Sequence, residues 1–296
     1  MNDTAISLDP AVATRLERLK ARAAILDVRG LLKVVADGKG ERVILKDIDL
    51  KVQRREFLCV VGPSGCGKST LIRTIAGLED AQDGTILVDG KPVRGPGPDR
   101  AMVFQSYTLF PWLSVLGNVM FGLEMAGQPK SEAAREARQW LNVVGLESYA
   151  DFYPHQLSGG MKQRVAIARA LAIRPRVLLM DEPFSALDAR TRARMQAYLI
   201  EIWRKIDITV VFITHDLDEA VLLADRVLVM KANPGELVEV LDVPALPGNR
   251  SLDDPALKAA LTRLEGRIHA QEQAMHGEED PQTPVARLAP IDDGEF

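Results

Sequence analysis

Residues 62–69 are Gly62-Pro63-Ser64-Gly65-Cys66-Gly67-Lys68-Ser69, and they match the phosphate-binding loop pattern G-x-x-x-x-G-K-[ST] at every specified position. The apolar run at 56–61 predicts a buried strand that enters this loop, and the run at 70–76 predicts a helix that leaves it. Glycines let the backbone turn back on itself, so successive N–H groups point into one hollow. The helix dipole adds positive charge at the same point. The loop, together with Thr70 behind it, is therefore predicted to bind the phosphates of a nucleotide.

Two side chains of this loop carry further chemistry. Lys68 can reach the β- and γ-phosphates of a nucleoside triphosphate, and the Ser69 hydroxyl can ligate Mg²⁺. The alternative is a glycine-rich turn that binds nothing. The strand and the helix predicted on either side disfavour that alternative, because they are the context in which such a loop binds phosphate.

The composition bounds the class of protein. The chain has 296 residues, of which 47% are apolar and 26% charged, which suits a soluble protein with a sizeable core. The net charge of −4 gives no general basic signal for nucleic acid, so no nucleic-acid partner is predicted. Cys59 and Cys66 are too few for a disulfide framework or a metal site, and we expect two reduced thiols. No secretory signal or apolar run of about 18 residues is found, so work at a membrane would require docking onto another protein.

A second motif places carboxylates beside the loop. The run Val177-Leu178-Leu179-Met180-Asp181 predicts an apolar strand that ends in a carboxylate. At the carboxyl end of a parallel sheet, Asp181 can hold Mg²⁺ directly or through water, and Glu182 can orient and polarise an attacking water. The run at 209–214 predicts another buried strand, and the helical pattern at 186–205 connects the two. This strand–helix–strand unit predicts a parallel sheet.

The segment Leu157-Ser158-Gly159-Gly160-Met161-Lys162-Gln163-Arg164 precedes a predicted helix over 165–171. Ser158, Gly159 and Gly160 therefore stand at a second helix N-terminus, whose free N–H groups form a second candidate anion site. This segment resembles the signature sequence of the ATP-binding subunits of ABC transporters. The resemblance covers roughly residues 28–245.

Other positions extend this resemblance. Gln105 matches the family's glutamine that senses Mg²⁺ and the attacking water. Residues Ser185-Ala186-Leu187-Asp188 match the loop that crosses to the opposing subunit. His215 matches the switch histidine that contacts the γ-phosphate. A lone histidine at a strand end is more often structural, but the ordered set of motifs favours the functional interpretation.

The resemblance implies an α/β fold with a P-loop NTPase core of the ABC ATPase type: a mainly parallel sheet, an antiparallel β subdomain and an inserted helical subdomain at about 106–165. It implies an ATPase in which two subunits, expected to be identical, bind each ATP between the phosphate loop of one and the Ser158-Gly159-Gly160 segment of the other. The implied catalytic residues are Glu182, His215, Gln105 and Lys68, and the implied Mg²⁺ ligands are Ser69, Gln105 and Asp181. The implied partners are permease subunits and, indirectly, a solute-binding protein, at the cytoplasmic face of the membrane.

Five of the fifteen aromatic residues fall within eighteen positions: Phe104, Tyr107, Phe110, Trp112 and Phe121. Such clustering predicts a groove that receives an apolar helix of a partner, although part of it must be core packing. In the family this region receives a coupling helix of the membrane subunit. The runs at 109–115 and 118–119 most resemble importer ATPases of the nitrate/sulfonate/taurine group, which implies a small anion or organic solute.

The sequence departs from the family at two places. Relatives usually hold adenine against an aromatic ring ahead of the phosphate loop, but no Phe, Trp or Tyr precedes Phe57. Val35 or Ala36 lies near the expected position, so adenine is predicted to bind more weakly. Arg55 occupies a turn position where the family often has glycine.

Segments outside the ATPase motifs divide the chain further. An amphipathic helix is predicted over 9–26, with Asp9 as its cap and the apolar stripe Val12, Leu16, Leu19, Ala23 and Leu26. It is expected to pack on its own domain or a neighbour rather than on a membrane surface. We therefore expect an N-terminal helical extension at 1–27, an ATPase domain at 28–245, a C-terminal helical extension at 246–276 and a disordered acidic tail at 277–296.

Two other functions compete with the importer interpretation. The first is a soluble ABC-type ATPase that acts on ribosomes or DNA, but only one ATPase half is present, and the 88 residues between Lys68 and Leu157 leave no room for a long coiled-coil insertion. The second is a nucleotide-dependent regulatory subunit that does not hydrolyse ATP, against which Glu182 and His215 argue.

Overall fold

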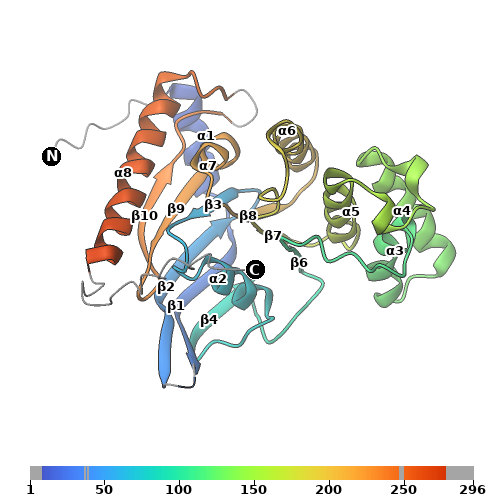
Figure 1. The fold of residues 1–296 in the computed structure, drawn as a ribbon, viewed down its shortest axis with the longest axis horizontal. Helices are drawn as coiled ribbons and strands as arrows, with labels where there is room; N and C mark the ends of the chain where they lie inside the picture. Colours follow the sequence, from blue (N-terminus) through green and yellow to red (C-terminus); the bar gives the residue numbers. More distant parts are fainter. Residues whose placement is uncertain (1–8, 37, 39, 247–249, 278–296) are drawn as a thin grey trace, which may run out of the picture.

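The structure is a computed structural model that describes residues 9–36, 38, 40–246 and 250–277. Its main body is built on a six-stranded sheet. A second, four-stranded sheet lies on one side of this body and a group of helices on another (Figure 1). No helix within the described residues is long and apolar enough to cross a bilayer.

The six-stranded sheet is mainly parallel, as predicted. Its strand order is β10-β9-β3-β8-β7-β6, in which β10 alone runs antiparallel to its neighbour. The strands are β3 (Phe57–Val61), β6 (Arg100–Val103), β7 (Val177–Asp181), β8 (Thr209–Ile213), β9 (Arg226–Lys231) and β10 (Glu236–Asp242). Every residue of β3, β7 and β8 is buried, which explains their near-continuous apolar sequences. The carboxyl ends of these three strands lie at one edge, where ligands of open α/β sheets bind.

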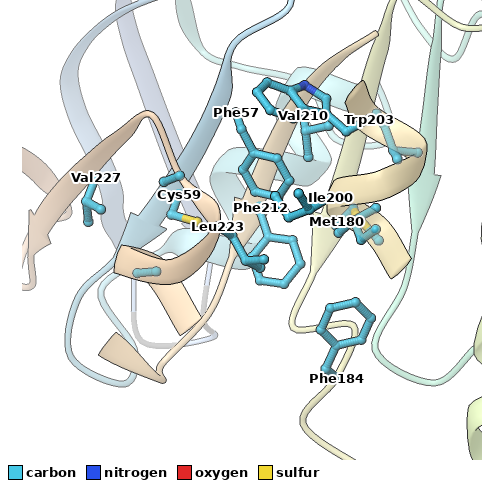
Figure 2. Packing of buried hydrophobic residues seen from close by; sticks show 14 of the residues in the cluster. Phe57, Cys59, Met180, Phe184, Ile200, Trp203, Val210, Phe212, Leu223 and Val227 are labelled. Atoms are coloured by element: carbon cyan, nitrogen blue, oxygen red, sulfur yellow. The ribbon is translucent and has the colours of Figure 1, made fainter. Parts of the chain in front are cut away.

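Aromatic packing fixes α6 (Ala189–Lys205) on one face of this sheet. The Phe57 ring lies 5.7 Å from the Trp203 ring and 5.8 Å from the Phe212 ring, and Phe184 lies 5.6 Å from Phe212 (Figure 2). Such offset and edge contacts add to the burial of the rings. Because Phe184 lies two residues after Glu182, this cluster also anchors the segment that follows β7.

A four-stranded antiparallel sheet packs beside the core and confirms the predicted β subdomain. Its order is β2-β1-β4-β5, formed by β1 (Ala24–Ala36), β2 (Glu41–Gln53), β4 (Asp83–Val88) and β5 (Lys91–Pro92). Leu26, Leu45 and Ile48 of this sheet share one buried cluster with Leu71 and Ile75 of α2 (Lys68–Ala76). The helix behind the phosphate loop is therefore held between two sheets.

The helical subdomain lies to one side of the core (Figure 1). It contains α3 (Val115–Met125), α4 (Lys130–Val143), the short helices η1 (Glu147–Tyr149) and η2 (Pro154–Gln156), and α5 (Gly159–Ala172). Its own core includes Val119, Leu141 and Val165. The α5 helix begins six residues before the predicted start at Val165, because the Ser158 hydroxyl accepts a hydrogen bond from the Met161 N–H and caps it.

The N-terminal prediction was wrong beyond residue 20. The first helix, α1, spans Pro10–Lys20 and not 9–26, and Ala24 and Leu26 belong to β1. Leu26 pairs with Val52 on one side and with Val88 on the other, so pairing within the sheet overrides the helical spacing of the apolar residues. The predicted boundary at residue 28 thus falls inside a strand.

Both terminal helices pack on the core. Val12, Leu16 and Leu19 of α1 are buried, as expected for a helix that packs on its own domain. At the other end α8 spans Pro255–Gly277, within which Leu257 and Leu264 are fully buried against α7 (Leu217–Leu223) and the core sheet. The acidic tail predicted over 277–296 lies outside the described residues from position 278 onward.

Candidate functional site

The phosphate-binding loop connects β3 to α2, as predicted. Gly65 and Gly67 adopt φ values of +78° and +94°, and a Cβ on Gly67 would lie 2.7 Å from Leu45 Cδ2. Glycine is therefore required at position 67 by both conformation and space. The buried Lys68 ammonium donates hydrogen bonds to the carbonyl oxygens of Gly62, at 2.7 Å, and Pro63, at 3.0 Å. These bonds hold the lysine over the hollow of the loop.

The two cysteines are free and buried. Cys66 Sγ lies 3.8 Å from Lys68 Nζ, and burial raises the pKa of the Cys66 thiol despite this neighbouring charge. Burial likewise raises the pKa of the Cys59 thiol, which lies on β3. Both raised pKa values favour the protonated thiol.

Asp181 and Ser69 meet where β7 ends beside the start of α2. The Ser69 hydroxyl donates a 2.9 Å hydrogen bond to Asp181 Oδ1. Burial raises the pKa of Asp181, while the bond from Ser69 and the charge of Arg73 oppose that rise. A hydroxyl and a carboxylate oxygen so placed are the hard oxygen donors that Mg²⁺ prefers, with its remaining positions left for water and phosphate. The described residues contain no cluster of three or more His, Cys, Asp or Glu side chains that could hold a metal ion.

Glu182 and His215 form a direct pair. Glu182 Oε2 lies 2.9 Å from His215 Nδ1, and the glutamate is the more buried partner. The Glu182 backbone has a φ of +43°, a strained conformation for a residue with a side chain, and its N–H donates to the Ile213 carbonyl at 3.1 Å. This strained turn directs the Glu182 carboxylate from the end of β7 toward His215, two residues after the end of β8.

Gln105 is joined to the same segment through Ser185. Gln105 Nε2 donates to Ser185 Oγ at 3.1 Å, and that hydroxyl donates to the Glu182 carbonyl at 3.0 Å. The amide is exposed, and its bonded neighbour is Ser185 rather than Ser69 or Asp181. The structure therefore brings Gln105 to the Glu182 segment by way of the loop at 185–188.

The signature segment lies on α5, away from the phosphate loop of the same chain. A hollow beside Ser158 and Gly160 is lined by residues of α5 and α6 and by none from 62–69. A Cβ on Gly160 would lie 2.7 Å from Thr191 Cγ2, so a larger residue would require the Thr191 side chain to shift. Ser158, Gly159 and Gly160 thus stand at an exposed helix N-terminus that the phosphate loop of the same molecule does not complete.

Sequence reasoning missed two charged residues behind the Glu182–His215 pair. Arg192 of α6 bonds to Asp216, and the buried Glu219 accepts a 2.9 Å hydrogen bond from Gln196 Nε2. Burial raises the pKa of Glu219. A hollow of about 10 Å³ between these residues and Glu182, His215 and Ser185 has room for about one water molecule. Charged residues near helix starts are common, so the sequence carried no signal for them.

An exposed aromatic surface lies on the helical subdomain. The Phe110 ring lies 5.5 Å from Trp112 and 4.5 Å from Phe121, and Trp112 and Met125 are each 71% exposed. The buried Asn118 side chain bonds to both backbone groups of Phe110 and so fixes the segment. Three of the five clustered aromatics therefore form this surface.

Comparisons with known proteins identify the family of this chain. Residues 45–185 match the family model for the ABC transporter. An uncharacterized ABC transporter ATP-binding protein of Methanocaldococcus jannaschii is 53% identical over 77% of this chain and 84% of its own length. The nitrate import ATP-binding protein of Synechocystis is 51% identical, over 76% of this chain and 84% of its own. The taurine import ATP-binding protein of Pseudomonas putida is 45% identical, over 79% and 92%.

A solved structure shares the fold. It is a dimeric ATP-binding cassette in a post-hydrolysis state with ADP and Pi, and it superposes with a TM-score of 0.67 at 30% identity, covering 75% of this chain and all of that one. The fold and the relatives together define an ATP-binding cassette. The chain belongs to the ABC transporter family, as one of its ATP-binding proteins, and it is an ATPase coupled to transport. The predicted fold class is confirmed.

Proposed function

We propose that this chain is the ATP-hydrolysing subunit of a membrane importer for a small anion or organic solute, and that it works as a pair of identical copies. The observation that carries the proposal is the pairing of Glu182 with His215 at 2.9 Å, beside the Ser69–Asp181 contact at 2.9 Å. A carboxylate for the water, a histidine for the phosphate and oxygen donors for a metal thus stand at one sheet edge.

ATP binding is assigned to the loop at 62–69 and to Thr70. The backbone N–H groups and the positive end of α2 attract the phosphates. Lys68 exchanges its bonds to the Gly62 and Pro63 carbonyls for the β- and γ-phosphates. Ser69 and Asp181 are the residues that would hold Mg²⁺, with Gln105 as a further ligand. When bound, that ion neutralises charge on the phosphate oxygens.

Hydrolysis is assigned to Glu182. Its carboxylate accepts a proton from the attacking water and so orients the water toward the γ-phosphate. His215, held by Glu182 through Nδ1, presents its other ring nitrogen to the γ-phosphate. A change in the bound water or metal shifts Gln105, and the hydrogen bond from Gln105 to Ser185 transmits that shift to the segment at 185–188. Positioning and charge stabilisation supply most of the rate in such reactions.

The second copy completes each site. The exposed α5 N-terminus at Ser158 cannot serve the phosphate loop of its own chain, but its N–H groups suit the γ-phosphate held by a second copy. The dimeric cassette with ADP and Pi supports this arrangement. ATP then joins the two copies, and hydrolysis followed by release of the phosphate removes the charged group that joins them.

The permease is proposed to dock on the aromatic surface formed by Phe110, Trp112 and Phe121. Exposed aromatics backed by a rigid buried anchor such as Asn118 are typical of binding hot spots. The relatives named for nitrate, bicarbonate and taurine import support a small anion or organic solute as cargo. The chain would then act as a peripheral subunit at the cytoplasmic face, with a solute-binding protein as an indirect partner.

Glu182→Gln tests this assignment. The change keeps the shape of the side chain but removes the acceptor for the proton of water, so we expect kcat for ATP hydrolysis to fall by about 100-fold or more. Binding of radiolabelled ATP should be retained. The matched control is Glu201→Gln, an exposed residue of α6 that forms an ion pair with Lys205 and should hydrolyse ATP at the wild-type rate. An unchanged turnover in Glu182→Gln would remove Glu182 from its role.

A further inference from the structure

One side chain connects the two loops that flank the catalytic pair. Arg192, near the start of α6, donates from Nη1 to Asp216 Oδ2 at 3.2 Å and from Nη2 to the Leu187 carbonyl at 3.2 Å. Asp216 directly follows His215, and Leu187 belongs to the segment at 185–188, which also bonds to Gln105 and Glu182. The guanidinium therefore spans the gap between the histidine and that segment.

Hydrogen bonds hold the backbone directly after His215 in place, although the His215 side chain itself is 62% exposed. Asp216 Oδ1 accepts the Glu219 N–H at 3.0 Å and caps α7, and the Asp216 N–H donates to Thr214 Oγ1 at 3.0 Å. Asp216 Oδ2 is thus the carboxylate oxygen left for Arg192. The position of the His215 backbone follows that of Asp216, so a force on Oδ2 moves the histidine.

Both terminal nitrogens of the Arg192 guanidinium donate a hydrogen bond. A planar group with fixed prongs can hold a carboxylate and a carbonyl at a set separation, which a lysine cannot do. Arg192 and Asp216 are only about one-third exposed, at 31% and 29%, so water competes weakly for the pair. Arg192 Nε is buried and makes no hydrogen bond within the described residues.

We infer that Arg192 is a positioning residue for ATP hydrolysis. It fixes the position of His215 relative to Glu182, and it makes that position depend on the segment at 185–188. The inference rests on the proposed function. In the proposed pair of copies this segment faces the second copy. A displacement of the segment at 185–188 is therefore transmitted through Arg192 to His215. Arg192 does not itself touch the nucleotide.

A purely structural role makes a different prediction. If Arg192 only stabilised α6 or the fold, its removal would lower stability and leave the chemistry of the folded fraction intact. A positioning role lowers kcat with little change in KM, because substrate binding by the loop at 62–69 does not pass through Asp216.

The test uses the full chain with Arg192→Gln, Arg192→Lys and the control Arg190→Gln, an exposed position on the same helix. We expect Arg192→Gln to lower kcat by about 10-fold or more, with KM within about twofold of wild type. Arg192→Lys should recover part of that loss, because lysine restores the charge but can bond to only one of the two partners, Asp216 or Leu187. Arg190→Gln should match wild type.

Asp216→Asn provides the second arm. Asparagine caps a helix as well as aspartate, so the variant keeps the α7 cap while losing the charge that Arg192 holds. If the arginine acts through Asp216, the double variant Arg192→Gln/Asp216→Asn should lose no more kcat than the worse single variant. Circular dichroism establishes that each variant is folded.

Three outcomes would overturn the inference: kcat of Arg192→Gln equal to wild type, a rise in KM with kcat unchanged, or fully additive losses in the double variant. Glu182→Gln separates these from failure of the proposed function. If Glu182→Gln is inactive while Arg192→Gln keeps wild-type kcat, only the inference fails. If the wild-type chain does not hydrolyse ATP, the proposed function fails and takes the inference with it.

Discussion

Glu182 holds its carboxylate in place with a backbone conformation that costs energy. Its φ of +43° lies in the left-handed region, which is unfavourable by about 1–2 kcal/mol for a residue with a side chain. The hydrogen bond to Ile213 and the packing of the adjacent Phe184 in the core hold it there. Strain of this kind concentrates at functional sites, where geometry outweighs local stability.

Arg55, which stands where the family often has glycine, also has a positive φ. Arg55 has a φ of +61°, so glycine would be the least strained residue at this turn. In compensation, the Arg55 N–H donates to Thr209 Oγ1 at 2.9 Å, and its guanidinium donates to the Arg204 carbonyl at 3.2 Å. The arginine thus connects the turn before β3 to the end of α6 and the start of β8.

A further prediction at the residue scale concerns adenine. Val35 is 41% exposed near the end of β1, where an aromatic ring would be expected. We expect Val35→Tyr to tighten ATP binding and to sharpen its preference over GTP, because stacking on a base contributes about 1–3 kcal/mol. Competition between the two nucleotides for the purified chain measures this effect.

The control for that prediction is Val43→Tyr. Val43 is 40% exposed on β2 and pairs with Val34, so its side chain lies on the opposite face of the hairpin from Val35. It should leave ATP binding unchanged. A wild-type chain that already prefers ATP strongly, with no response to Val35→Tyr, would contradict the proposed weakness in adenine binding.

At the scale of elements, α1 is part of the fold of the ATPase core. Arg15 donates from Nε and Nη2 to Oδ1 of Asp225, a carboxylate that is 1% exposed and that also accepts the N–H of Phe57 at the start of β3. The Arg15 guanidinium also lies over the Trp203 ring, at 5.6 Å. The helix therefore covers a buried charge directly below the strand that leads to the phosphate loop.

Removal of that arginine should destabilise the whole domain. Arg15→Ala removes the cation that is hydrogen-bonded to Asp225 and leaves the charge of Arg250 to act on that carboxylate without a bond. We expect the free energy of unfolding to fall by about 2–4 kcal/mol, since Arg15 itself is partly exposed. Denaturant unfolding measures this loss. Arg18→Ala, an exposed position on the same helix, should lose less than about 0.5 kcal/mol. Equal stabilities of the Arg15 and Arg18 variants would show that α1 does not shield Asp225.

Elements with a local signal were predictable, and those set by distant contacts were not. The buried strands β7 and β8 follow from their apolar runs, and the loop at 62–69 from its glycines and lysine. The end of α1 did not follow, because Leu26 has helical spacing but joins a sheet through Val52 and Val88. Arg192 was missed for the same reason, since its role depends on Leu187 and Asp216 meeting in space.

At the scale of the whole molecule, the proposed site is divided between two faces. The loop at 62–69 and the Glu182–His215 pair lie at the carboxyl edge of the core sheet, while Ser158 begins α5 in the helical subdomain. One molecule holds both proposed halves of the ATP site but does not bring them together. Association of two copies is therefore the step that the account requires, and ATP is the ligand that should drive it.

The most direct measurement is the mass of the Glu182→Gln chain in solution, by light scattering, with saturating ATP and Mg²⁺. The account predicts a dimer under these conditions and a monomer with ADP or without nucleotide, because the retained γ-phosphate joins the two copies. A second change, Ser158→Arg, should abolish the dimer while ATP still binds. A Glu182→Gln chain that binds ATP and remains monomeric, even with its permease supplied, would contradict the central claim.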